Sequence, residues 1–480
     1  MQGLLNLRLF VFVLLLQLRF TSSYPHGHRE AALLKGDPDV LTRSIHGEHD
    51  HWVPVWTAMP QLVEPANLPP APFNGTTATF TNTTLRQTIH LTTHISSIRL
   101  VLSNAFGTTP LSITRATIAL SRQQNATSNA SGAGSSIVDP TTLVVLSFNG
   151  GCPNVGISEG ATVVSDAIDF AAEAQADVSV SLYLAEGQQG KDVTGHPGSR
   201  TTSWLSHGDR SGEEGVRDDG TETVAHWYFI SALLASSSRH HRSLVLIGDS
   251  LTDGRGSTTD ANNRWPDQLL SLLHSNTTSP LRGPFSILNQ AAGGNALLLP
   301  PSASGPNGPP ALARLDRDVL SFPGGPSHVL VFIGINDIGV TAATESAQAD
   351  IAAALIAGYK ELVTRVRVAT AWRGRTAREF AATLTPFCAD AACGKSDVQQ
   401  YSSQEREVAR QAVNSWIRGT QVAGWFDGVV DLDRAVRNDS EGGSVLRADL
   451  DSGDHLHLNV KGYGVLARAM FGFGEDVGMW

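Results

Sequence analysis

The chain has 480 residues, of which 41% are hydrophobic and 17% are charged. This length allows two domains with separate cores, and the composition excludes a disordered chain. The formal net charge of −10 argues against a nucleic-acid partner, which would favour a basic surface.

Residues 1–23 have the features of a signal peptide. Arg8 precedes the apolar run 9–16, and small residues follow at 21–23. Because that run is too short to span a bilayer, we expect cleavage and a secreted, extracellular protein with no integral membrane segment. Asn-x-Ser/Thr sequons agree with export and predict a glycoprotein. They begin at Asn74, Asn82, Asn125, Asn129, Asn276 and Asn438.

Residues 24–51 are polar and rich in histidine. We interpret this segment as a disordered leader. A metal-binding tract is the alternative, but the histidines have no regular ligand spacing.

The chain contains 3 cysteines. Cys388 and Cys393 lie in a loop-like segment and can form a disulfide in an oxidising compartment. Cys152 is then left over, and we expect it to be a small buried residue. No second cysteine pair is present, so no metal site is expected here.

Residues 52–238 predict a β-sandwich domain. The runs 98–102, 111–120 and 178–184 are strand-like, and turn-forming clusters separate them.

Residues 239–480 predict a second domain of the α/β class. Four apolar segments, 244–247, 328–333, 381–384 and 428–432, alternate with predicted helices at 350–367 and 406–418. This alternation favours a parallel sheet covered on both sides, a three-layer α/β/α architecture.

Four short blocks in the second domain carry candidate chemistry. Each follows a predicted strand or lies on a terminal loop, and each alone is more often a simple turn or cap. The blocks are Gly248-Asp249-Ser250-Leu251, Asn289 to Asn295 with Gly293-Gly294, Gly334-Ile335-Asn336-Asp337, and Asp454-His455-Leu456-His457.

The residue types in these blocks suit acyl transfer. A serine after a strand, here Ser250, is exposed and firmly held. Gly294 lets the backbone approach a substrate and donate its N–H, and the Asn336 amide can point to the same place. An Asp and a His three residues apart can share a loop, so that the carboxylate orients the imidazole toward the serine. These are the components of a Ser-His-Asp triad with an oxyanion hole.

The four blocks, in this order, resemble those of the SGNH (GDSL-type) esterases and acylhydrolases. The resemblance covers residues 244–470. It implies that Ser250 is the nucleophile, His457 the base and Asp454 its partner. It also implies that the N–H groups of Ser250 and Gly294 and the Asn336 amide form the oxyanion hole. The upstream segments 103–107 and 195–204 are similar to the β domain of secreted fungal and bacterial members.

Spacing alone leaves two choices open in the last block, because His455 competes with His457 and Asp451 competes with Asp454. The Asp-x-x-His form of the family favours Asp454 and His457.

The segment 156–160 matches the nucleophile-elbow pattern of α/β-hydrolases, but no helix is predicted after Ser158, and a surface turn is the better interpretation.

Residues 368–380 depart from the family pattern, which usually crosses from helix to strand by a short turn. We interpret them as an extra basic segment, either a surface insertion or an error in the gene model.

The sequence therefore predicts a secreted serine carboxylic-ester hydrolase that needs no metal or organic cofactor. We expect short acyl or O-acetyl esters as substrates, and both polysaccharide-linked and lipid esters stay open. The alternative is a glycan-binding or adhesion protein on the same scaffold, without turnover. The oligomeric state is not predicted.

Overall fold

The computed structural model describes residues 51–123, 132–276, 281–303, 305–420 and 424–480. Residues 50–480 pack as one compact unit. The predicted signal peptide and residues 24–50 of the predicted leader lie outside the described residues. The last residue of the predicted leader, His51, is the first residue of β1 (His51–Thr57). Within the described ranges, no helix has both the length and the apolar character needed to cross a membrane.

The first part of the unit consists of β-strands, as the sequence predicts. After β1 they are β2 (Gln61–Leu62), β3 (Ala78–Thr79), β4 (Thr83–His90), β5 (Ile95–Ser103), β6 (Leu111–Ile113), β7 (Arg115–Arg122), β8 (Ile137–Val138), β9 (Val144–Val145), β10 (Val155–Ile157), β11 (Thr162–Val164), β12 (Ile168–Ala172), β13 (Asp177–Leu184), β14 (Gln188–Gln189), β15 (Thr194–His196), β16 (Ser203–His207), β17 (Glu222–Val224), β18 (Trp227–Tyr228) and β19 (Ile230–Ser237).

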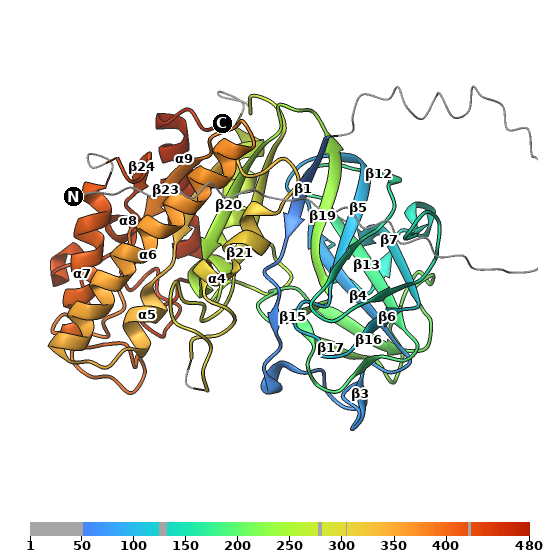
Figure 1. Ribbon diagram of the computed structural model, residues 1–480. Helices are drawn as coiled ribbons and strands as arrows, with labels where there is room; N and C mark the ends of the chain where they lie inside the picture. The colour runs from blue at the N-terminus through green and yellow to red at the C-terminus, as the bar shows by residue number, and fades with distance from the viewer. Residues whose placement is uncertain (1–50, 124–131, 277–280, 304, 421–423) are drawn as a thin grey trace, which may run out of the picture. The chain divides into compact units, whose positions relative to one another are not determined.

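These strands form two main antiparallel sheets that pack as a β-sandwich (Figure 1). One sheet has the order β1-β19-β5-β11, with β12 also paired to β5. The other has the order β17-β16-β4-β13-β7-β8, with β9 also paired to β7. Alternate side chains of both sheets, among them Leu100, Ile118 and Val180, meet in one apolar core. The predicted strand 111–120 is divided at Thr114, because β6 pairs with β10 whereas β7 pairs with β13.

The second part alternates strands with helices. Its elements are β20 (Arg242–Gly248), α2 (Ser250–Asp253), α3 (Trp265–Ser275), β21 (Phe285–Ala291), α4 (Ala311–Leu315), the π-helix η3 (Asp316–Leu320), β22 (His328–Phe332), α5 (Ile335–Val340), α6 (Glu345–Trp372), β23 (Arg378–Ala382), α7 (Gln404–Gly419), β24 (Gly428–Val430), α8 (Leu432–Val436) and α9 (Val460–Asp476). Short 3-10 turns are η1 (Pro65–Asn67), η2 (Pro140–Thr142) and η4 (Asp439–Glu441).

The strands of this part form a parallel sheet in the order β21-β20-β22-β23-β24. Apolar runs with no polar face, such as 244–247, form its buried strands. The chain leaves β20 toward one side of the sheet for β21 and then crosses to the other side for β22. The carboxyl ends of β20 and β22 therefore mark a topological switch point, where open α/β sheets bind ligands.

Helices cover both faces of the parallel sheet. Right-handed crossovers that run in opposite directions place their helices on opposite faces. Thus α6 packs with α7 on one face and α3 packs with α9 on the other. Figure 1 shows α5, α6 and α7 together on the face nearest the viewer. The predicted three-layer α/β/α architecture is confirmed.

The segment 368–380 is not an extra surface insertion. α6 continues to Trp372, and β23 begins at Arg378, so only a short turn joins them. The strand starts earlier than predicted because Arg378 pairs with His328 at the beginning of β22. Trp372 is 91% exposed, which explains why apolar periodicity did not reveal the last turn of the helix.

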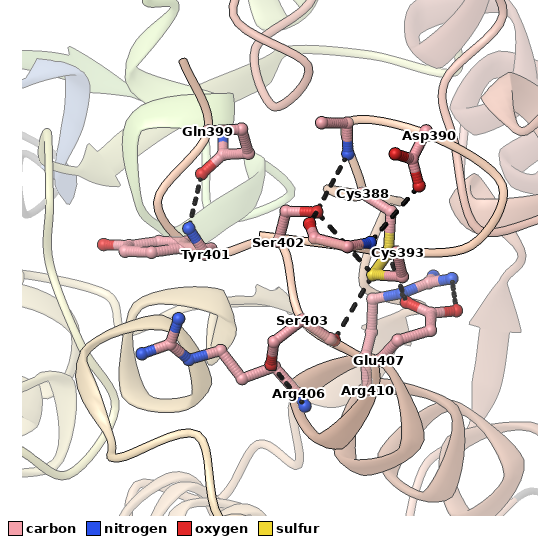
Figure 2. The surroundings of a disulfide bond; sticks show 12 residues. Cys388, Asp390, Cys393, Gln399, Tyr401, Ser402, Ser403, Arg406, Glu407 and Arg410 are labelled. Atoms are coloured by element: carbon pink, nitrogen blue, oxygen red, sulfur yellow. Dashed lines mark hydrogen bonds and ion pairs between the residues drawn. A yellow bond between two sulfur atoms is a disulfide. The ribbon is translucent and has the colours of Figure 1, made fainter. Parts of the chain in front are cut away.

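The cysteine predictions are half right. Cys388 and Cys393 form a disulfide, with their Cα atoms 4.8 Å apart (Figure 2). Cys152, in contrast, is exposed and not buried. It lies at the end of a tight turn where its backbone pairs with that of Phe148, and this pairing directs its side chain to solvent.

Candidate active site

Ser250 begins α2 directly after β20. The Asp249 carboxylate caps this short helix by accepting the N–H of Leu251 at 3.0 Å. Parallel register aligns Gly248 with Ala291 of β21 and with Phe332 of β22. The three strands therefore end at one level, and the residues that follow them, including Gly294 and Asn336, meet around Ser250 at the switch point.

Ser250, His457 and Asp454 form a continuous hydrogen-bonded relay. Ser250 Oγ lies 2.7 Å from His457 Nε2, and His457 Nδ1 lies 2.6 Å from Asp454 Oδ2. Because a carboxylate can only accept, Nδ1 donates to Asp454 and Nε2 of the neutral ring accepts from the serine hydroxyl. The second carboxylate oxygen, Asp454 Oδ1, accepts the backbone N–H of His457 at 2.8 Å and that of Leu456 at 3.1 Å.

The competing residues of the last block form a separate pair. His455 Nδ1 lies 2.9 Å from Asp451 Oδ2, and Asp451 Oδ1 accepts the backbone N–H of His455 at 3.1 Å. His457 with Asp454 therefore contacts Ser250, whereas His455 with Asp451 forms a pair outside this relay.

The electrostatics of the relay suit a neutral base beside a charged partner. Burial lowers the pKa of His457, and Arg255 and Arg200 lower it further, while Asp454 partly opposes these effects. For Asp454, burial acts to raise the pKa, but the hydrogen bonds and charge of His457 outweigh it and hold the pKa well below its usual range. At neutral pH, Asp454 is therefore an ionised carboxylate and the His457 imidazole is neutral.

The residues of the three predicted oxyanion donors, Ser250, Gly294 and Asn336, line one cavity. Gly294 adopts a left-handed conformation with φ of 72°, which glycine allows without strain. Among the described residues, neither the Ser250 N–H nor the Gly294 N–H donates to a protein acceptor. Asn336 Nδ2 donates to Asn295 O at 2.9 Å, which uses one of its two hydrogens and leaves the other for a substrate.

Tyr401 was not identified from the sequence. Its hydroxyl donates to Asn336 Oδ1 at 2.9 Å and so fixes which end of the amide presents its N–H. Its neighbour Gln399 donates from Nε2 to Asp454 O at 2.9 Å and accepts the backbone N–H of Tyr401. Figure 2 shows both residues on the loop between the Cys388–Cys393 disulfide and α7, with the tyrosine ring directed away from the disulfide.

A second set of contacts that the sequence did not reveal links the β-sandwich part to the Gly293-Gly294 turn. Buried Asp253 accepts the Gly293 N–H at 2.9 Å through Oδ2 and contacts His196 Nε2 at 2.9 Å through Oδ1. His196 Nδ1 in turn donates to Met59 O at 3.0 Å. A Cβ at Gly198 would lie 1.8 Å from Asp253 Oδ2, so only glycine permits this approach. The chain of contacts holds the Gly293-Gly294 turn in place.

Ser250 and His457 open into a cavity of about 720 Å³. Its lining comes from both parts of the unit. The sandwich side contributes mainly polar groups: Gln61, Glu64, Asn67, Arg200 and His226. The loop 398–401 and the Gly305-Pro306-Asn307 turn complete the rim. A single cavity is therefore lined by Ser250, His457, Gly294 and Asn336 and by a polar wall.

The comparison with known families agrees with this geometry. Residues 246–465 match the model of the GDSL-like Lipase/Acylhydrolase family. This part of the chain is similar to that family. The matched region contains all four sequence blocks and supports a carboxylic ester hydrolase.

No curated protein sequence matches the chain significantly. Among solved structures, the chain is similar to Est24, a carbohydrate acetylesterase from Sinorhizobium meliloti, with 16% identity over 49% of this chain and 99% of that one (TM-score 0.36). It is also similar to the M. smegmatis aryl esterase, with 17% identity over 50% of this chain and 99% of that one (TM-score 0.36). A third is Axe2, an acetylxylan esterase from Geobacillus stearothermophilus, with 19% identity over 49% of this chain and 94% of that one (TM-score 0.32).

Proposed function

We propose that the protein is a secreted serine esterase in which Ser250 is the nucleophile, His457 the general base and Asp454 the residue that orients it. The observation that carries this proposal is the 2.7 Å contact between Ser250 Oγ and His457 Nε2. A serine hydroxyl is a weak nucleophile unless an adjacent base accepts its proton, and this contact supplies that base.

In the proposed mechanism, Ser250 Oγ attacks the ester carbonyl while its proton passes to His457 Nε2. The negative charge on the carbonyl oxygen is stabilised by the N–H groups of Ser250 and Gly294 and by the Asn336 amide. The tetrahedral intermediate then expels the alcohol, which takes the proton from His457, and an acyl-enzyme remains. A water molecule, deprotonated by His457, attacks this acyl group, and the acid leaves as Ser250 recovers its proton.

We propose short acyl or O-acetyl esters as the substrates. A long acyl chain needs a pocket lined mainly by apolar side chains. The cavity beside Ser250 has amide, carboxylate and guanidinium groups on its sandwich side instead, and apolar side chains such as Val398 and Leu456 are a minority of its lining. This polarity favours a small acyl group and a hydrophilic alcohol.

Export and glycosylation also belong to the proposal. The predicted signal peptide supports secretion, and an oxidising compartment agrees with the Cys388–Cys393 disulfide. Of the sequons, Asn125 and Asn129 lie outside the described residues, and Asn82 is exposed at the start of β4.

Replacing Ser250 by alanine tests the function. We expect purified Ser250→Ala to fold normally and to have no turnover of p-nitrophenyl acetate above background, because no other hydroxyl occupies its place beside His457. Ser271→Ala, which removes an exposed hydroxyl on α3, is the matched control and should keep full activity. Full activity of Ser250→Ala rejects the assignment. A wild-type protein that hydrolyses no ester would favour the non-catalytic alternative.

A further inference from the structure

Arg200 brings a positive charge to the active-site cavity without a protein partner for it. The residue lines the cavity together with Ser250 and His457. Its Nε is buried and makes no hydrogen bond, and among the described residues its guanidinium donates to no acceptor and forms no ion pair. Other buried arginines have acceptors for their guanidinium groups: Arg410 and Arg314 pair with carboxylates, and Arg86 donates to backbone carbonyls. Arg200 therefore differs from arginines with a structural role.

The backbone at Arg200 is held in an uncommon conformation. Its φ is 52°, in the left-handed region that favours glycine. The Arg200 carbonyl accepts the N–H of Asp260 at 3.0 Å, and the Asp260 carboxylate accepts from the N–H and Oγ1 of Thr202, each at 2.6 Å. A strained residue that its surroundings hold so firmly is characteristic of a functional position.

A second cation lies at the same end of the cavity. Arg255 follows the nucleophile segment, donates its backbone N–H to Ser250 O at 3.0 Å, and places Nε 3.9 Å from Asp454 Oδ2. Its side chain is 63% exposed, so a ligand can reach it. Both Arg255 and Arg200 line the same cavity as Ser250 and His457, and the charges of both act to lower the pKa of His457.

The carboxylate in the polar wall belongs to another part of the cavity. Glu64 accepts from Gln61 Nε2 at 2.5 Å and from Asn67 Nδ2 at 3.0 Å, so its oxygens are already engaged. Its charge acts on His226, whose pKa is lowered mainly by burial and raised in part by Glu64. The cavity thus contains two arginines, of which Arg255 lies near the Asp454 carboxylate, whereas Arg200 has no ion-pair partner among the described residues.

We propose that Arg200, assisted by Arg255, forms a subsite for a carboxylate group of the substrate. A partly buried guanidinium is costly without an anionic partner, and its planar fork of donors matches a carboxylate. The substrate class is then an ester that also carries a free carboxylate near the scissile bond, on either its acyl or its alcohol part. This inference rests on the proposed esterase function and adds the charge of the substrate to it.

Paired esters that differ only in this charge test the subsite. For the acyl part, 4-nitrophenyl hydrogen succinate is compared with its neutral methyl ester. For the alcohol part, 3-(carboxymethyl)phenyl acetate is compared with its methyl ester. We expect wild-type kcat/KM to favour the acid in one of the two pairs by about tenfold or more, the effect of one charge-assisted contact. The pair that shows the preference identifies the part of the substrate that carries the charge.

Variants then assign the preference to Arg200. In Arg200→Gln, the ratio of kcat/KM between the acid and its ester should fall by about tenfold, whereas Arg200→Lys should keep part of it. Arg122→Gln, which removes an exposed charge at the end of β7, is the control and should leave the ratio unchanged. Using the ratio cancels any general loss of activity in a variant.

The proposal is overturned if neither pair shows a preference, or if the preference persists in Arg200→Gln. Hydrolysis of p-nitrophenyl acetate without any preference for acids rejects the subsite alone, whereas no hydrolysis of any ester rejects the esterase function as well.

If Arg200→Gln does not fold, inhibition of the wild-type enzyme tests the subsite instead. Monomethyl succinate should compete with p-nitrophenyl acetate better than dimethyl succinate does, and this difference should shrink at high salt. Equal inhibition by the two compounds overturns the proposal.

Discussion

The parallel sheet and the β-sandwich contribute to one cavity in different ways. The sheet provides strand ends at a single level. Its loops place the Ser250 hydroxyl within hydrogen-bonding distance of the His457 imidazole, and they bring Gly294 and Asn336 into the same cavity. The sandwich provides no member of the relay. It contributes a polar wall, the unpaired Arg200, and the His196 contact that holds the turn before Gly294. From this difference we infer that the sheet carries the reacting groups, and we expect the sandwich to affect how precisely the site is held and which ester it accepts.

The largest expected effect is on the sheet side. Asn336→Ala removes an oxyanion donor, so we expect kcat to fall by about 10² to 10³ with a smaller change in KM. Steady-state kinetics with p-nitrophenyl acetate measures this loss, and circular dichroism checks the fold. Asn154→Ala, an exposed asparagine in the sandwich, is the control. A loss in KM alone would show that Asn336 binds the substrate without stabilising the charged intermediate.

A smaller loss should come from the sandwich side. His196→Gln breaks the contact to Asp253, which then loses one of its buried partners and holds the Gly293 N–H less firmly. We expect kcat to fall by about tenfold, the cost of disturbing one buried charge-assisted contact. His240→Gln, on the exposed turn between β19 and β20, should have no effect. Unchanged activity in a folded His196→Gln would show that the sandwich does not support the chemistry.

Tyr401→Phe tests whether the rim of the cavity positions the Asn336 amide. Removing one neutral hydrogen bond should lower kcat by about two- to tenfold and leave KM nearly constant. Tyr183→Phe, which removes an exposed contact to Asn82, is the matched control. If Tyr401 only packs against its neighbours, the variant should lose thermal stability without a specific loss in kcat.

The pH profile tests the state of the base. Only the neutral imidazole can accept the serine proton, so activity is lost as the pH falls through the pKa of His457. Because burial lowers this pKa from its ordinary value of 6.5, the acidic limb of kcat/KM should have its midpoint below pH 6.5. A midpoint above pH 6.5 would contradict the electrostatics described for the relay.

Local patterns in the sequence were sufficient to predict the fold class. Buried strands of a parallel sheet are continuous apolar runs, and the residues after them must meet at one edge, so the shared position of Ser250, Gly294 and Asn336 in one cavity was predictable. The contacts of Asp253 with His196 and of Asn336 with Tyr401 were not, since each joins segments more than fifty residues apart whose meeting depends on the packing of two sheets or of a long loop. Cys152 was wrongly expected to be buried because residue type alone does not show which way a turn directs a side chain.

The most direct test of the central claim is covalent labelling of the wild-type protein by a fluorophosphonate, followed by mapping of the modified peptide by mass spectrometry. Only a serine activated by a base reacts readily with this reagent. We expect one adduct, on Ser250, and much slower labelling in His457→Gln. No adduct on the folded wild-type protein, or an adduct on a different serine, would contradict it.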